Sequence, residues 1–159
     1  MDEQDSKQFM QEAIDLSFTG MANKEGGPFG AVVVRNNEII GRGNNRVTKD
    51  NDPTSHAEIN AIRDACKNIG SFQLTDCVVY TSCEPCPMCL AAIYWARVKK
   101  IYFGCSRIDA AAIGFDDDFI YEEIKKSKTH RSIEVEQISR VDAIEAFLEW
   151  ENKIDKVKY

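Results

Sequence analysis

The chain has 159 residues, of which 43% are hydrophobic and 29% are charged. This length and balance fit one globular domain with a core of its own, and they argue against an intrinsically disordered chain. The formal net charge of −6 argues against a nucleic-acid partner, because proteins that bind the phosphate backbone usually present a basic surface.

The sequence predicts a cytoplasmic protein. Its first residues, MDEQDSKQFMQ, are acidic and polar and lack the apolar segment of a signal peptide. No apolar run is long enough to span a membrane. The six cysteines are therefore expected to be reduced thiols, core residues or metal ligands rather than disulfides.

The N-terminal part predicts one helix followed by a hairpin. Residues 6–23 repeat apolar side chains at helical spacing, until the sequence GGPFG ends the helix. Residues 31–34 and 38–43 are predicted strands. The Asn36-Asn37 pair between them favours the left-handed backbone of a tight hairpin turn.

Two further helices, each next to a strand, are predicted in the middle of the chain. The Asp-Pro pair at 52–53 is typical of a helix start, and this helix is expected to end at Gly70. Residues 77–82 are a predicted buried strand, and Pro85 is expected to start the next helix. Residues 99–104 then form another strand.

The C-terminal part predicts a helix near FIYEEIKK, a strand near SIEVEQI and an amphipathic helix over about 141–154. Alternation of apolar strands with helices predicts an α/β fold: a mixed, partly parallel five-stranded sheet with helices on both faces. In such a fold, successive helix N-termini lie along one edge of the sheet.

Potential metal ligands lie at two of these helix starts. His56 is near the first start, and Cys86 and Cys89 are near the second. The positive end of a helix favours the thiolate form of cysteine. One imidazole and two thiolates suit zinc, and three protein ligands leave the fourth tetrahedral position for water, as in catalytic sites. We therefore predict a catalytic zinc centre.

Glu58 is the predicted catalytic acid–base group. The pattern H-x-E…P-C-x-x-C is the signature of zinc nucleobase deaminases, in which the glutamate carries protons and does not bind the metal. Here it is His56-Ala57-Glu58, followed by Pro85 to Cys89. Residues two apart on a regular helix point roughly 200° away from one another. The signature, not the spacing, therefore places His56 and Glu58 at one centre.

Cys83, Cys86 and Cys89 also permit other interpretations, because an iron–sulfur segment, a redox pair and half of a structural zinc site share such spacings. An iron–sulfur cluster would need a fourth cysteine nearby, and the next one is Cys105. Cys83 is predicted to be a packed thiol close to the pocket that binds no metal. The remaining cysteines, Cys66, Cys77 and Cys105, are expected to be small core residues.

From GGPFGAVVV to FDDDFIYEEI, and again at its last residue, the chain resembles the short guanine deaminases of the cytidine and deoxycytidylate deaminase superfamily. The zinc motif is common to cytidine, cytosine and tRNA adenosine deaminases, whereas FDDDF and the C-terminal tyrosine resemble the guanine branch. The resemblance implies a three-layer α/β/α sandwich in a single domain over 1–159, with one zinc ion per subunit. It also implies a homodimer that hydrolyses guanine to xanthine and ammonia.

The resemblance further implies which residues bind the substrate. Asn45 and Asp117 match positions that bind the base, where an amide can donate and accept while a carboxylate only accepts. Phe29 is expected to stack on the ring and Trp95 to close the pocket. Ala57, within the HAE motif, is also expected to contact the substrate.

Tyr159 matches a tyrosine that, in the family, crosses to the partner subunit and closes over the guanine. The segment of about 140–159 is therefore expected to be exchanged between subunits. Three alternatives remain at this point: a guanosine deaminase, a tRNA adenosine deaminase, and a zinc module without enzymatic activity.

Overall fold

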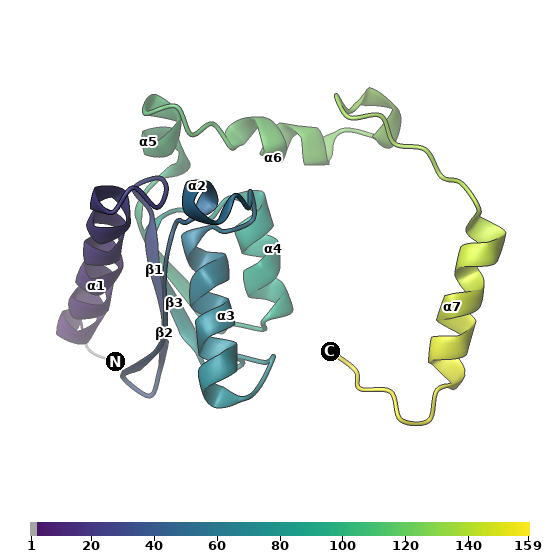
Figure 1. The fold of residues 1–159 in the computed structure, drawn as a ribbon, viewed down its shortest axis with the longest axis horizontal. Helices are drawn as coiled ribbons and strands as arrows, with labels where there is room; N and C mark the ends of the chain where they lie inside the picture. Colours follow the sequence, from purple (N-terminus) through teal and green to yellow (C-terminus); the bar gives the residue numbers. More distant parts are fainter. Residues whose placement is uncertain (1–2) are drawn as a thin grey trace. The chain divides into compact units, whose positions relative to one another are not determined.

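The computed structural model describes residues 3–159, which divide into two compact units (Figure 1). The first unit ends at Asp118 and the second is Phe119–Tyr159. In the part of the chain that is described, no helix has the length and apolar character needed to cross a membrane.

Four strands form the sheet of the first unit, in the order β2-β1-β3-β4. β1 (Gly30–Arg35) pairs antiparallel with both β2 (Glu38–Asn44) and β3 (Val78–Cys83). β3 pairs parallel with β4 (Lys100–Cys105). The sheet is therefore mixed, as predicted.

Helices cover both faces of this sheet, so the first unit has the three layers expected of an α/β/α sandwich. α1 (Glu3–Ala22) covers one face, and α3 (Ala57–Ile69) and α4 (Pro87–Trp95) cover the other (Figure 1). Two short helices that the sequence does not predict, α2 (Val47–Asp50) and α5 (Arg107–Ala112), lie in connecting segments.

The alternating side chains of β1 divide between two apolar cores. Val32 and Val34 pack with Phe9 beneath α1, whereas Ala31 and Val33 pack with a row of alanines on α3. The hairpin after β1 turns at the predicted Asn36-Asn37 pair, where both residues have positive φ. These contacts hold α1 and α3 against the two faces of the sheet.

The two helices that carry the predicted metal ligands begin later than the sequence predicts. α3 begins at Ala57 rather than at the Asp-Pro pair. Asp52 instead forms a turn, accepting hydrogen bonds from the backbone N–H (2.8 Å) and the hydroxyl (2.7 Å) of Thr54. α4 begins at Pro87 rather than Pro85. The local prediction fails because aspartate and proline favour turns as well as helix starts.

α6 spans Asp118–Lys125, and all of it except its first residue belongs to the second unit. The second unit also contains a 3₁₀ turn (Lys128–His130) and α7 (Arg140–Asn152). The predicted fifth strand near SIEVEQI is wrong, because the segment forms no strand and the sheet found over residues 3–159 has four strands. Its alternating sequence suits a strand, but a strand also needs a neighbour for its backbone hydrogen bonds.

The close packing of α3 on β2 gives a stability prediction. A Cβ atom at Gly43 would lie 2.3 Å from the carbonyl oxygen of Ala57 and 2.4 Å from the nitrogen of Ala61. Gly43→Ala should therefore push α3 away and lower the free energy of unfolding by about 1–3 kcal/mol in urea titrations. Glu38→Ala, at the exposed start of the same strand, is the control and should change it by less than about 0.5 kcal/mol.

Candidate metal centre and substrate site

His56, Cys86 and Cys89 converge at the N-terminal ends of α3 and α4. His56 is the N-cap of α3, Cys86 is the N-cap of α4, and Cys89 lies in the first turn of α4. Both caps have extended backbone, and neither cap side chain bonds the backbone of its own helix. The imidazole and the thiol are therefore available to a shared ligand.

The distances in this cluster fit a tetrahedral zinc ion. Nδ1 of His56 lies 3.6 Å from Sγ of Cys86 and 3.5 Å from Sγ of Cys89. All three ligand atoms lie within 4.8 Å of one another. Zinc bonds of about 2.0 Å to nitrogen and 2.3 Å to sulfur separate the two ligand atoms by about 3.5 Å at the tetrahedral angle. The donor types and their spacing thus both match zinc.

Hydrogen bonds within the cluster set the protonation of its two thiols. Those from Cys89 and His56 lower the pKa of Cys86 to about 4, although burial opposes the shift. The pKa of Cys89 is raised by its hydrogen bond with Cys86 and by burial. The hydrogen bond to Cys86 likewise raises the pKa of His56. The cluster therefore holds protons that a divalent cation would displace.

Glu58 lies beside this cluster because His56 precedes the helix. On a regular helix, side chains two residues apart point roughly 200° away from one another. His56 has a ψ of 160° and lies outside the helix, so its side chain and that of Glu58 can face the same centre. Glu58 is 6% exposed, and burial raises the pKa of its carboxyl group, while His56 and Cys89 oppose the shift. A buried carboxyl group with a raised pKa can hold and release a proton nearer neutral pH.

The other predicted thiols differ in their surroundings. Cys83 lies outside the cluster, with its Sγ 3.7 Å from the carbonyl oxygen of Ser106, and burial raises its pKa to about 12. This environment is that of a packed thiol. Cys77 is buried and Cys66 is half-buried, but Cys105 is exposed, so the prediction of a core role for Cys105 is wrong.

Asn45 is buried next to the loop that precedes β1. Its Oδ1 accepts hydrogen bonds from the backbone N–H of Gly27 (3.2 Å) and of Val47 (3.3 Å). Its own backbone N–H donates to the carbonyl oxygen of Phe29 at 2.9 Å. With the oxygen used in this way, the amide nitrogen of Asn45 is the group available to donate to a ligand.

Asp117 carries a buried carboxylate oxygen without a hydrogen-bond partner. This atom is Oδ1, and burial raises the pKa of the carboxyl group, with the charge of Cys86 contributing in the same direction. An acceptor in this state is stabilised by an N–H donor on a ligand. Two residues earlier, Phe115 packs edge-to-face on Phe29, with ring centroids 4.9 Å apart.

The remaining predicted residues are Ala57, Trp95 and Tyr159. Ala57 is fully buried directly after His56. Trp95 is 65% exposed at the end of α4, about 9 Å along the helix axis from Cys89. Its role in closing the pocket stays a prediction. Tyr159 belongs to the second unit, and its role stays a prediction.

Two features of the site were not predicted from the sequence. Phe115 precedes the aspartate run as an ordinary apolar residue, so only its contact with Phe29 indicates a role. The GG pair of the GGPFG sequence was interpreted as a helix terminator. A Cβ atom at Gly26 would lie 2.1 Å from Oδ1 of Asn45, so this glycine also permits the loop to approach the site.

Comparison with known proteins agrees with this geometry. Residues 3–105 match the model of the cytidine and deoxycytidylate deaminase zinc-binding region. The chain belongs to this family.

Among the members of this deaminase family, guanine deaminase from Bacillus subtilis (strain 168) is 50% identical over 151 residues, which cover 95% of this chain and 97% of that protein. An X-ray structure of guanine deaminase from Bacillus subtilis matches with a TM-score of 0.94 and 48% identity, covering 100% of this chain and 99% of that one. The tRNA-specific adenosine deaminase of Haemophilus influenzae is 43% identical over 97 residues, which cover 58% of this chain and 56% of that protein.

Metal content tests the assignment of the deaminase zinc ligands. Cys86→Ala removes one of three donors and should reduce bound zinc from near stoichiometric to a small fraction, measured by elemental analysis of the purified protein. Cys83→Ala removes a buried thiol of the same segment and is the matched control, which should retain zinc. Equal zinc loss in both variants would contradict the assignment.

Proposed function

We propose that this protein is a guanine deaminase that hydrolyses guanine to xanthine and ammonia, with one zinc ion per subunit held by His56, Cys86 and Cys89. The observation that carries the proposal is the His-Cys-Cys cluster beside the buried Glu58, in a chain similar over almost its whole length to a guanine deaminase. A cytoplasmic location stays a prediction of the sequence.

The chemistry divides between the metal and Glu58. Zinc, when bound, lowers the pKa of a water molecule and makes it a nucleophile for the carbon that bears the amino group. Glu58 takes the proton of the attacking water and passes it to the ring nitrogen beside C2 of guanine. It then takes the proton of the hydroxyl group added at C2 and delivers it to the amino group, so that the C–N bond breaks, ammonia leaves and the C2 carbonyl of xanthine forms. Burial supports this role, because it raises the pKa of the carboxyl group.

Recognition of the base is assigned to Asn45 and Asp117. The amide nitrogen of Asn45 would donate to an acceptor on guanine, since its oxygen already binds two backbone N–H groups. The unpartnered oxygen of Asp117 would accept from an N–H group of the base. Phe29, with Phe115 against its edge, offers a face for the ring.

A tRNA adenosine deaminase is the second candidate, because the chain is 43% identical to one over 97 residues. The net charge of −6 weighs against it, and α7 carries four acidic residues and one basic residue. We therefore propose a free purine as substrate, and nucleic acid is the less favoured partner.

We also propose a homodimer in which the C-terminal segment of about 140–159 is exchanged between subunits. Its support is the exposure of large apolar residues in the second unit, whose helices bury none of their residues within this chain. Among them are Val141 (74% exposed), Phe147 (73%) and Ile154 (103%). A second copy of the chain would cover such residues, and exchange of an identical element is a low-cost route to a dimer.

Ammonia release over a panel of bases and nucleosides tests the activity. Guanine should be turned over. The comparison substrates are guanosine, adenine, cytosine, cytidine and a tRNA that carries adenosine at position 34. Glu58→Gln should keep its zinc but lose at least about 100-fold in kcat, because the amide cannot carry the proton. Full-rate turnover by this variant would remove Glu58 from the mechanism, and a preference for guanosine or tRNA would replace the proposed substrate.

Deletion of Tyr159 tests the exchanged segment. The deleted chain should keep its fold and zinc, while kcat/KM for guanine falls about tenfold, the size of one lost hydrogen bond to the substrate. Mixing it with Glu58→Gln chains should restore activity, because one hybrid site then contains both groups. Unchanged kinetics would contradict the role of Tyr159, and a sedimentation mass of 18.0 kDa at micromolar concentration would contradict the dimer.

A further inference from the structure

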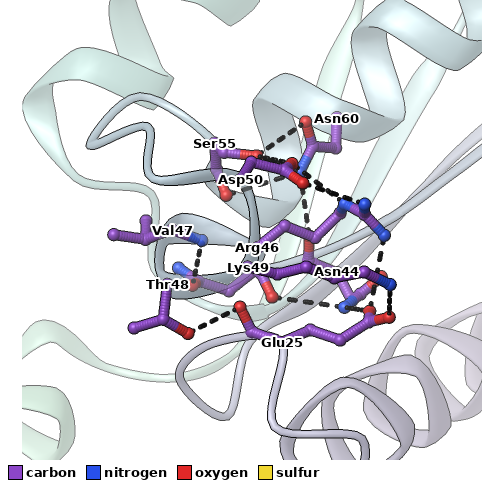
Figure 2. Close-up of polar contacts among 10 residues, drawn as sticks. Glu25, Asn44, Arg46, Val47, Thr48, Lys49, Asp50, Ser55 and Asn60 are labelled. Carbon is purple, nitrogen blue, oxygen red and sulfur yellow. Dashed lines mark hydrogen bonds and ion pairs between the residues drawn. The ribbon is translucent and has the colours of Figure 1, made fainter.

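A charged cluster that the proposed chemistry does not use lies directly beside Asn45. We call it the Glu25 cluster and define it as Glu25, Asn44, Arg46, Lys49 and Asp50 (Figure 2). Glu25 belongs to the loop between α1 and β1, and the other four lie in the segment from the end of β2 to the end of α2. The cluster therefore joins two segments that are distant in sequence.

Glu25 makes the central contacts of this cluster. Its carboxylate accepts a hydrogen bond from Nδ2 of Asn44 at 2.7 Å, forms an ion pair with Lys49, and lies 3.6 Å from Nη1 of Arg46. The side chain is only 12% exposed. The hydrogen bonds from Lys49 and Asn44 lower the pKa of Glu25, so it is charged at neutral pH. An exposed ion pair contributes little, and Lys49 is 48% exposed, but the Glu25 carboxylate itself is shielded and has three partners.

The backbone of Glu25 holds the same segment. Its carbonyl oxygen accepts from the hydroxyl of Thr48 at 2.8 Å and from the N–H of Lys49 at 3.0 Å. Side chain and backbone of one residue thus bind both the end of β2 and α2. No other residue of the loop before β1 has this many contacts with residues 44–50 among those described.

Arg46 extends the cluster toward the metal ligand His56. Its guanidinium donates to Asp50 at 3.0 and 2.9 Å, and Asp50 accepts from the hydroxyl of Ser55 at 2.9 Å. The backbone N–H of Arg46 also donates to the carbonyl oxygen of Ser55 at 2.9 Å. This second set of contacts holds the start of α3 without Glu25, so loss of Glu25 should leave the metal ligands in place.

The residue after Glu25 is Gly26, whose backbone lies directly against the side chain of Asn45. A Cβ atom there would lie 2.1 Å from Oδ1 of Asn45, and the next residue, Gly27, donates its N–H to the same oxygen. The position of this loop therefore decides which end of the Asn45 amide faces the backbone. With the oxygen bound to two backbone N–H groups, the nitrogen is the end of the amide that can donate to a ligand.

We propose that Glu25 is a positioning residue for base binding, which fixes the amide of Asn45 so that its nitrogen donates to the substrate. It acts through Asn45 and touches neither the substrate nor the reacting atoms. This inference rests on the proposed role of Asn45 in a purine deaminase. It predicts that the effect of Glu25 appears in KM rather than in kcat.

The test begins with Glu25→Gln, which removes the charge and keeps the size of the side chain. KM for guanine should rise about tenfold, the size of one hydrogen bond lost between Asn45 and the base, while kcat stays within about twofold and zinc content is unchanged. Glu12→Gln is the matched control. It breaks another ion pair of the first unit, 2.8 Å from Arg42, and should leave KM unchanged.

A double-mutant comparison shows whether Glu25 acts through Asn45. In an Asn45→Ala background, Glu25→Gln should cause no further rise in KM, because the amide that it positions is absent. Additive effects of the two substitutions would overturn the inference. A fall in kcat together with zinc loss in Glu25→Gln would also overturn it, because the role would then be structural.

Amide hydrogen exchange gives a readout that does not depend on the substrate. The N–H groups of Gly27 and Val47, which both donate to Asn45, should exchange faster in Glu25→Gln than in the wild type or in Glu12→Gln. Unchanged exchange overturns the inference whatever the substrate is. By contrast, failure of the wild type to release ammonia from guanine overturns the proposed function. In that case the hydrogen-exchange result still shows whether Glu25 positions Asn45.

Discussion

The site depends on the meeting of two helix N-caps at one edge of the sheet. An N-cap side chain commonly bonds the free N–H groups of its own helix, which stabilises the helix end. At α3 and α4 the cap residues are His56 and Cys86, and neither makes that bond. The helix ends forgo this stabilisation, and the two side chains, with Cys89, form a donor set that matches zinc in type and in spacing. The position of Glu58, the proposed acid–base group, follows from the same arrangement, because the residue two positions after a cap lies in the first helical turn.

The packing of the first unit places the N-terminal ends of α3 and α4 next to each other. Glycines on β2 let α3 approach the sheet closely, and alternate residues of β1 fill the cores on both faces. The helices are held along their length by these cores, which brings their N-terminal ends to the same edge of the sheet. One half of the site is thus made by two helix starts, and the other half is made by loops that have contacts of their own, such as those of Glu25.

The sequence predicts the fold of the first unit well, because its elements are set by local patterns: apolar runs for the strands, an Asn-Asn pair for the hairpin and Gly70 for the end of α3. It predicts the convergence of His56, Cys86 and Cys89 through a motif that names residue types at fixed spacings. It misplaces the helix starts, because Asp52 and Pro85 favour turns and helices alike. The strand near SIEVEQI fails for another reason, since strand pairing is a property of the folded chain that local patterns do not contain. The Glu25 cluster shows no sequence pattern, because its members come from two distant segments.

The second unit has a consequence for how the protein responds to dilution. Its helices bury no residue within this chain, whereas the first unit has two apolar cores. A segment without an interior takes its stability from the surface that it meets, and if that surface is a second copy, its order depends on protein concentration. The candidate metal ligands lie in the first unit and do not share this dependence. On dilution the protein would then keep its metal and lose the ordered C-terminal segment, so the two units would fail at different concentrations.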